Sequence, residues 1–208
     1  NCVSAVLQLG LKDRAVIDRL LGIVEDSKQD SDLHRFCAFA VGQLGLKDHA
    51  VIDRLLSIAE DSKQDGDLHH YCASAIGKLG FGDRAVDILL NIAEDGKQDS
   101  DLRSDCASAV GELGLKDRAI IDRLLGISEE SKQDSDLRSY CAYSVGELGL
   151  KDYTVIDRLL GIAEDSKQDG NLRSDCAKAV GELGLKDRAV IDRLLNIAED
   201  SKQDSFLR

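Results

Sequence analysis

The sequence predicts an all-α protein, an α-solenoid made of six two-helix repeats. Two observations carry this prediction. The sequence repeats itself around six cysteines that are 34 or 35 residues apart, namely Cys2, Cys37, Cys72, Cys106, Cys141 and Cys176. The 208 residues also include no Pro, Met or Trp and only 4% aromatic residues, so the core must come from Ala, Val, Ile and Leu of adjacent repeats.

The first helix of each repeat is expected over the segment that corresponds to residues 101–113 of the fourth repeat. Leu102, Cys106, Ala109, Val110 and Leu113 follow the spacing of one buried helix face. The Ser or Gly before this segment is an accepted N-cap, and the predicted caps are Ser31, Gly66, Ser100, Ser135, Gly170 and Ser205. A glycine suited to a left-handed helix stop ends the segment, at Gly10, Gly45, Gly80, Gly114, Gly149 and Gly184.

The second helix is expected over residues 118–130, with Asp117 as its N-cap. One hairpin cannot enclose the apolar faces of both helices, so neighbouring repeats must stack. No linker interrupts the series, which predicts a single domain. Its repeats are residues 1–31, 32–66, 67–100, 101–135, 136–170 and 171–205, and residues 206–208 begin a further one.

Charge and composition argue against several classes of partner. The net charge is −12, which disfavours nucleic acid and anionic membrane surfaces. No apolar run approaches the ~20 residues that span a bilayer, and no signal peptide is visible. Because the chain lacks a starting Met, we expect it to be a fragment or a processed form.

The pattern D-L-R-x-x-C-A-x-A-V-G-E-L-G, followed by D-R-A-V and L-L-x-I-A-E-D, resembles the HEAT-like repeats of the phycobilisome-lyase type. The resemblance covers the whole chain. It implies a right-handed solenoid whose first helices line a concave, partner-binding surface. It also suggests an alternative function, as a bilin lyase or a chromophore-handling subunit.

Residues that could bind a metal or catalyse a reaction have simpler interpretations. The cysteines share one position on the buried face, so we expect reduced core thiols and a cytoplasmic protein. Histidines such as His34 and His69 stand where later repeats have Arg103. Repeated carboxylates lie beside arginines and are expected to form ladders between repeats. The sequence therefore predicts no enzyme, no metal and no cofactor.

The positions at which the repeats differ indicate where a partner binds. Three such positions share one face of each first helix, with spacing i, i+3 and i+7. They carry five of the eight aromatic residues, which are favoured interface anchors. The predicted partner-binding residues are Phe36, Phe39, Gln43, Tyr71, Ser74, Lys78, Asp105, Ser108, Glu112, Tyr140, Tyr143, Glu147, Asp175, Lys178 and Glu182.

The predicted function is a non-enzymatic scaffold that holds a protein partner of basic character on this face. A third hypothesis is end-to-end self-assembly, because the chain begins inside a first helix and ends at the start of another.

Overall fold

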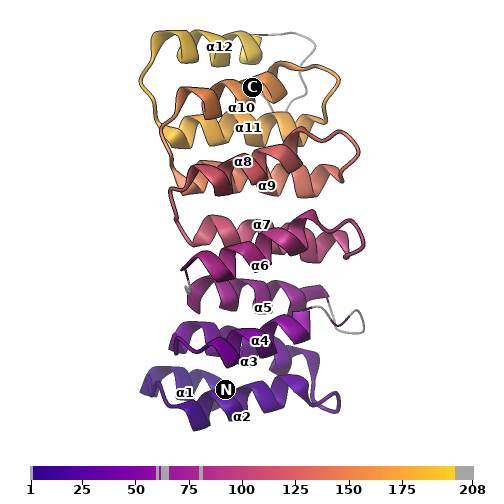
Figure 1. Cartoon of the computed structure of the whole chain (residues 1–208), viewed down its shortest axis with the longest axis vertical. Helices are drawn as coiled ribbons and strands as arrows, with labels where there is room; N and C mark the ends of the chain where they lie inside the picture. The colour runs from indigo at the N-terminus through magenta and orange to yellow at the C-terminus, as the bar shows by residue number, and fades with distance from the viewer. Residues whose placement is uncertain (1, 60, 62–65, 80–81, 200–208) are drawn as a thin grey trace. The chain divides into compact units, whose positions relative to one another are not determined.

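The computed structural model describes residues 2–59, 61, 66–79 and 82–199, and it is all-helical over these residues, with no strand (Figure 1). The all-α prediction is confirmed. The predicted helix stop Gly80, the predicted cap Ser205 and residues 206–208 lie outside this part of the chain. The helices described are α1 (Cys2–Leu9), α2 (Arg14–Glu25), α3 (Ser31–Leu44), α4 (His49–Ala59), α5 (Gly66–Leu79), α6 (Gly82–Glu94), α7 (Ser100–Glu112), α8 (Arg118–Glu129), α9 (Ser135–Leu148), α10 (Tyr153–Glu164), α11 (Gly170–Leu183) and α12 (Arg188–Glu199).

The chain divides into two compact parts, Asn1–Leu113 and Gly114–Arg208. Within the first part, α3 packs on α5 and α5 on α7, and within the second, α9 packs on α11. The second helix of each repeat packs closely against the first helix of the next, as α2 does on α3 and α10 on α11 (Figure 1). The hairpins with the most extensive contact therefore straddle the boundaries of the sequence repeats.

The caps of the first helices differ from the prediction. The N-cap is the aspartate one residue earlier, because the Asp134 side chain accepts hydrogen bonds from the backbone amides of Asp136 and Leu137. Asp30, Asp99 and Asp169 cap α3, α7 and α11 in the same way. The predicted cap Ser135 is instead the first helical residue. A carboxylate in this place also interacts favourably with the positive end of the helix dipole.

The other two predicted helix ends are confirmed where they are described. Asp117 caps α8 by accepting hydrogen bonds from the amides of Ala119 and Ile120. Gly149 ends α9 with a φ of +66°, in the left-handed region that favours glycine. Gly10, Gly45, Gly114 and Gly184 also have positive φ.

The cysteines are free thiols, and five of the six are buried, as predicted. Cys2 departs from the prediction because it is exposed. Burial raises the pKa of Cys37 to about 11 and that of Cys72 to about 12. These thiols therefore stay protonated at neutral pH and act as small core residues.

The arginine position of the first helix has a structural role that the sequence did not reveal. Arg138 is 5% exposed, and its Nε donates a 2.8 Å hydrogen bond to the backbone carbonyl of Ser128 in the last turn of α8. Arg103 and Arg173 make the equivalent bond to Ala93 and Ala163. A buried cation thus satisfies a carbonyl at the negative end of the preceding helix. His34 and His69 place a ring nitrogen on the carbonyls of Asp26 and Asp61 instead.

The predicted ladders between repeats are present on the second helices. Arg158 of α10 contacts Glu129 and Asp122 of α8 at 2.6 and 2.8 Å. Arg54 contacts α2 and Arg193 contacts α10 through the same repeat positions. These pairs are partly exposed, so each contributes only about 0–1 kcal/mol to stability. Because the same ion pairs recur between successive repeats, we interpret these carboxylates as structural residues.

Candidate partner-binding surface

In the first part of the chain, the predicted binding residues on α3 and α5 include three aromatic side chains, two of which contact each other. Phe36 is 49% exposed. The Phe39 ring meets the Tyr71 ring edge to face, with centroids 6.4 Å apart. The Lys78 ammonium of α5 stands 5.0 Å from the centroid of the Phe39 ring. This face therefore combines exposed apolar area with a positive charge held over an aromatic ring.

The next helix of this part, α7, adds carboxylates to the same face. Asp105 accepts a 2.7 Å hydrogen bond from Nδ1 of His70, and this bond raises the pKa of His70. Glu112 accepts a 3.4 Å hydrogen bond from the Ser74 hydroxyl of α5. His70 was not among the predicted residues. Gln43 of α3 is exposed and Ser108 of α7 is half-buried.

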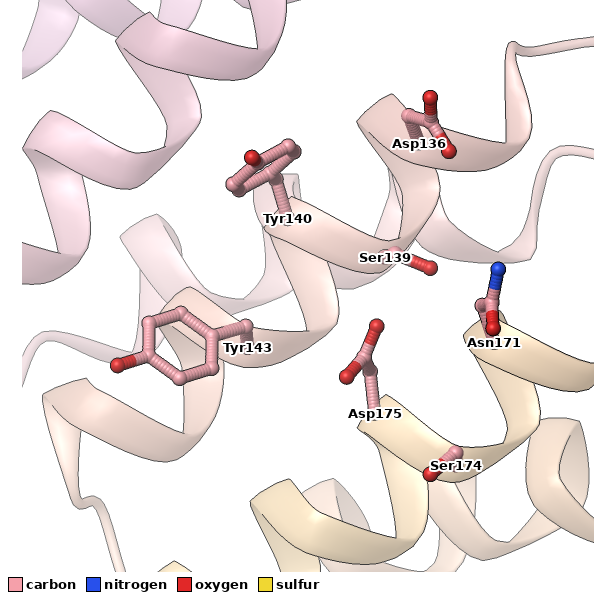
Figure 2. Close-up of a pocket in the computed structure, with 7 residues that line it drawn as sticks. All are labelled: Asp136, Ser139, Tyr140, Tyr143, Asn171, Ser174 and Asp175. Atoms are coloured by element: carbon pink, nitrogen blue, oxygen red, sulfur yellow. The ribbon is translucent and has the colours of Figure 1, made fainter. Parts of the chain in front are cut away.

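In the second part of the chain, a groove of about 590 Å³ opens between α9 and α11. Figure 2 shows its lining side chains, which come only from these two helices. Three of them were predicted from the sequence, namely Tyr140, Tyr143 and Asp175. The other four are Asp136, Ser139, Asn171 and Ser174. The volume is within the roughly 300–1,000 Å³ that ligand pockets usually have.

The carboxylate of Asp175 in this groove has a perturbed pKa. It is half-buried, and burial raises its pKa above the ordinary value. A hydrogen bond from Ser139 and the charge of Lys178 act in the opposite direction, and Asp169 adds to the increase. Part of the cost of removing this negative charge from water therefore remains uncompensated.

The remaining predicted residues of this part lie beside the groove. The Lys178 ammonium stands 4.9 Å from the centroid of the Tyr143 ring and 4.0 Å from a carboxylate oxygen of Glu182. The Tyr143 hydroxyl donates a 2.9 Å hydrogen bond to Glu147. Each compact part therefore has one such cation–π pair between consecutive first helices. Lys78 lies over Phe39 in the first part, and Lys178 lies over Tyr143 in the second.

The structure brings the predicted residues together in two sets, one on α3, α5 and α7 and one on α9 and α11. Partner binding by either set stays a prediction. The four lining residues that were not predicted, Asp136, Ser139, Asn171 and Ser174, lie nearer the N-termini of α9 and α11 than the predicted residues do. One signal was available, because Asn171 stands where the other first helices have Asp, as at Asp101 and Asp136.

Two further findings concern metal ligands and membrane-spanning helices. Within residues 2–59, 61, 66–79 and 82–199, no group of three or more His, Cys, Asp or Glu side chains is placed to hold a metal ion. The same residues include no helix with the length and hydropathy needed to cross a membrane.

Comparison with known proteins finds similar solved structures but no match in sequence. No family model matches the chain, and no curated protein is similar to it in sequence. The chain is similar in structure to human deoxyhypusine hydroxylase in complex with glycerol, with 14% identity, 92% coverage of each chain and a TM-score of 0.40.

This comparison corrects one prediction. We expected from the sequence that the chain is not an enzyme, and the similar structure is that of an enzyme. At this identity and TM-score the likeness transfers no activity and no residue role to the chain. Bilin binding and end-to-end assembly are not addressed by it and stay predictions.

Proposed function

We propose that the chain is a protein-recognition scaffold that holds a partner of basic character along the face of its first helices. In this proposal the hairpins are HEAT-like repeats of the phycobilisome-lyase type, stacked as a right-handed α-solenoid in the cytoplasm. The core is the repeated part, formed by Leu, Ile, Val, Ala and the buried cysteines. The first-helix face carries the differences between repeats.

The groove between α9 and α11 is the observation that carries the proposal. It gathers two tyrosines and two aspartates from consecutive first helices around one open volume of about 590 Å³. Tyrosine supplies a large contact area together with a polar group, which is why it is enriched in protein interfaces. In the first part, the exposed Phe36 and the half-buried pair of Phe39 and Tyr71 offer comparable anchors.

Charge supports the choice of a basic partner. The chain has a net charge of −12, and the groove is lined by Asp136 and Asp175. Complementary charge speeds association and disfavours acidic competitors, so binding should weaken as salt is raised.

The test is affinity capture from a cell extract, followed by measurement of the purified partner's affinity. The variant replaces four aromatic residues together, as Phe36→Ala, Phe39→Ala, Tyr140→Ala and Tyr143→Ala. The matched control is Tyr153→Ala, since Tyr153 is 57% exposed but lies on the second helix α10. Circular dichroism establishes that both proteins remain helical.

The proposal expects the fourfold variant to lose at least about tenfold in affinity, because interface aromatic anchors contribute about 2 kcal/mol or more. The control should bind like the wild type. Equal affinity of the wild type and the folded fourfold variant for the same purified protein would contradict the proposal.

A further inference from the structure

We propose that the groove between α9 and α11 receives an arginine side chain of the partner, with Asp175 as the acceptor of its guanidinium group. This inference rests on the proposed function and names the chemical group that the groove selects. Its observations are the charges, the acceptors and the aromatic rings that α9 and α11 bring to one open volume.

The lining of the groove is negative and rich in hydrogen-bond acceptors. Asp136 of α9 and Asp175 of α11 contribute carboxylates from facing helices, and the described lining includes no cationic side chain. Asn171 adds an amide oxygen beside them. Figure 2 shows the Asp175 carboxylate directed toward α9, near the Ser139 hydroxyl. A cation placed here would recover the solvation that Asp175 has lost by its partial burial.

The shape and the rings favour arginine over lysine. A guanidinium group is planar, carries five donors in a fixed geometry and stacks on aromatic faces. The groove has acceptors on both helices, Asp136 on α9 and Asp175 on α11, and the Tyr140 ring lies beside them. This arrangement suits a planar group with several donors better than a compact ammonium. The neighbouring ring of Tyr143 already has a cation above it, the Lys178 ammonium at 4.9 Å from its centroid.

Asp105 and Asp175 differ in the side chain that the preceding first helix places beside them. Asp105 and Asp175 occupy the same repeat position, directly before the cysteine. Asp105 is already bonded to His70 of the preceding first helix at 2.7 Å. At the corresponding place α9 has Ser139, whose shorter side chain hydrogen-bonds Asp175 and lines the open groove with it. Ser in place of His therefore leaves no imidazole beside Asp175.

The experiment uses the full chain with uniform ¹⁵N labelling and a defined probe, the peptide acetyl-Gly-Arg-Gly-amide. Amide chemical shifts are followed as the probe is added. Two comparison peptides replace Arg with citrulline, which has the same shape without the charge, or with Lys. The variant Asp175→Asn removes the proposed acceptor, and Asp105→Asn removes the equivalent carboxylate as the matched control.

The proposal expects saturable shifts in the first half of α9 and α11, with a Kd of the order of 1 mM. The citrulline peptide should give no saturable shift, and the Lys peptide should bind several-fold more weakly than the Arg peptide. Asp175→Asn should weaken binding of the Arg peptide by about tenfold, equivalent to about 1.4 kcal/mol, while Asp105→Asn leaves it unchanged.

The inference would be overturned by equal binding of the Arg peptide to the wild type and to folded Asp175→Asn, or by equal binding of the Arg and Lys peptides. Its failure can be told apart from failure of the proposed function. A protein partner that requires the four aromatic residues but binds Asp175→Asn with full affinity removes only the arginine site. Saturable binding of the Arg peptide, with a captured partner indifferent to the four aromatic residues, removes the scaffold proposal and keeps the site.

Discussion

Gly146 and Gly181 occupy the same repeat position in α9 and α11, and the structure predicts opposite effects of Gly→Ala at these two sites. A Cβ atom at Gly146 would lie 2.9 Å from Cα and 3.0 Å from Cβ of Ala179, and 2.6 Å from a carboxylate oxygen of Glu182. The Glu182 side chain can rotate away, but the backbone at Ala179 can only move with α11. At Gly181 a Cβ atom would meet nothing within 4 Å.

The magnitudes follow from two opposing contributions. Alanine is favoured over glycine inside a helix by about 1 kcal/mol, and this gain applies at both sites. Overpacking of a close contact costs about 1–3 kcal/mol, and this cost applies only to Gly146. We therefore expect Gly181→Ala to raise the free energy of unfolding by about 1 kcal/mol and Gly146→Ala to lower it by about 1 kcal/mol.

The assay is urea unfolding followed by far-UV circular dichroism. Both glycines lie in Gly114–Arg208, so both substitutions report on unfolding of the same compact part. A difference of about 2 kcal/mol separates the two midpoints by about 1 M urea, given slopes of about 1–3 kcal/mol/M. The control is Gly161→Ala in α10, where a Cβ atom also meets nothing within 4 Å. A midpoint for Gly146→Ala at or above that of the wild type, with the expected gain in the control, would refute the reasoning.

Three further predictions concern the buried arginine, the thiols and the histidine pair. Arg138→Met keeps the aliphatic stem but leaves the Ser128 carbonyl without its donor, so urea unfolding should show a loss of about 1–3 kcal/mol. An aromatic disulfide reagent at pH 8 should react rapidly with one thiol of the folded chain, Cys2, and with all six thiols after denaturation. The other five react slowly in the folded chain because they are buried, and burial also raises the pKa of thiols such as Cys72. Rapid reaction of several thiols in the native protein would contradict the described core. The hydrogen bond to Asp105 raises the pKa of His70, so its contribution to stability is complete below the ordinary pKa of 6.5 and is lost as pH rises through the raised value. NMR titration should place the His70 pKa above 6.5 and lower in Asp105→Asn than in the wild type; an unchanged His70 pKa in that variant would disprove the role of the bond.

The candidate surface was only partly accessible from the sequence. Variation between repeats pointed to Tyr140, Tyr143 and Asp175, which do line one groove. Ser139 was not among the predicted residues, although its repeat position also varies and carries Arg, His or Ser. A groove depends on which side chains of two different helices face each other. Variation at single positions carries no information on that pairing.

The prediction that the chain is not an enzyme failed for a related reason. It relied on the repetition of charged residues, and repetition describes what the helices share. A catalytic or binding site can be built from the few positions that differ, so the absence of a familiar motif excludes little.

Much of the local structure of this protein can be predicted from neighbouring residues in the sequence. Helix periodicity, the cap at Asp117 and the stop at Gly149 depend on residues within about four positions of one another, so the printed order of residues suffices to predict them. The contacts of identical residues in different repeats, in contrast, become visible only in the folded molecule. Gly146 touches Ala179 whereas Gly181 has open space, and Asp105 meets His70 whereas Asp175 lines a groove. The physical reason is that contact and solvation depend on the neighbouring helix, and each repeat has a different neighbour.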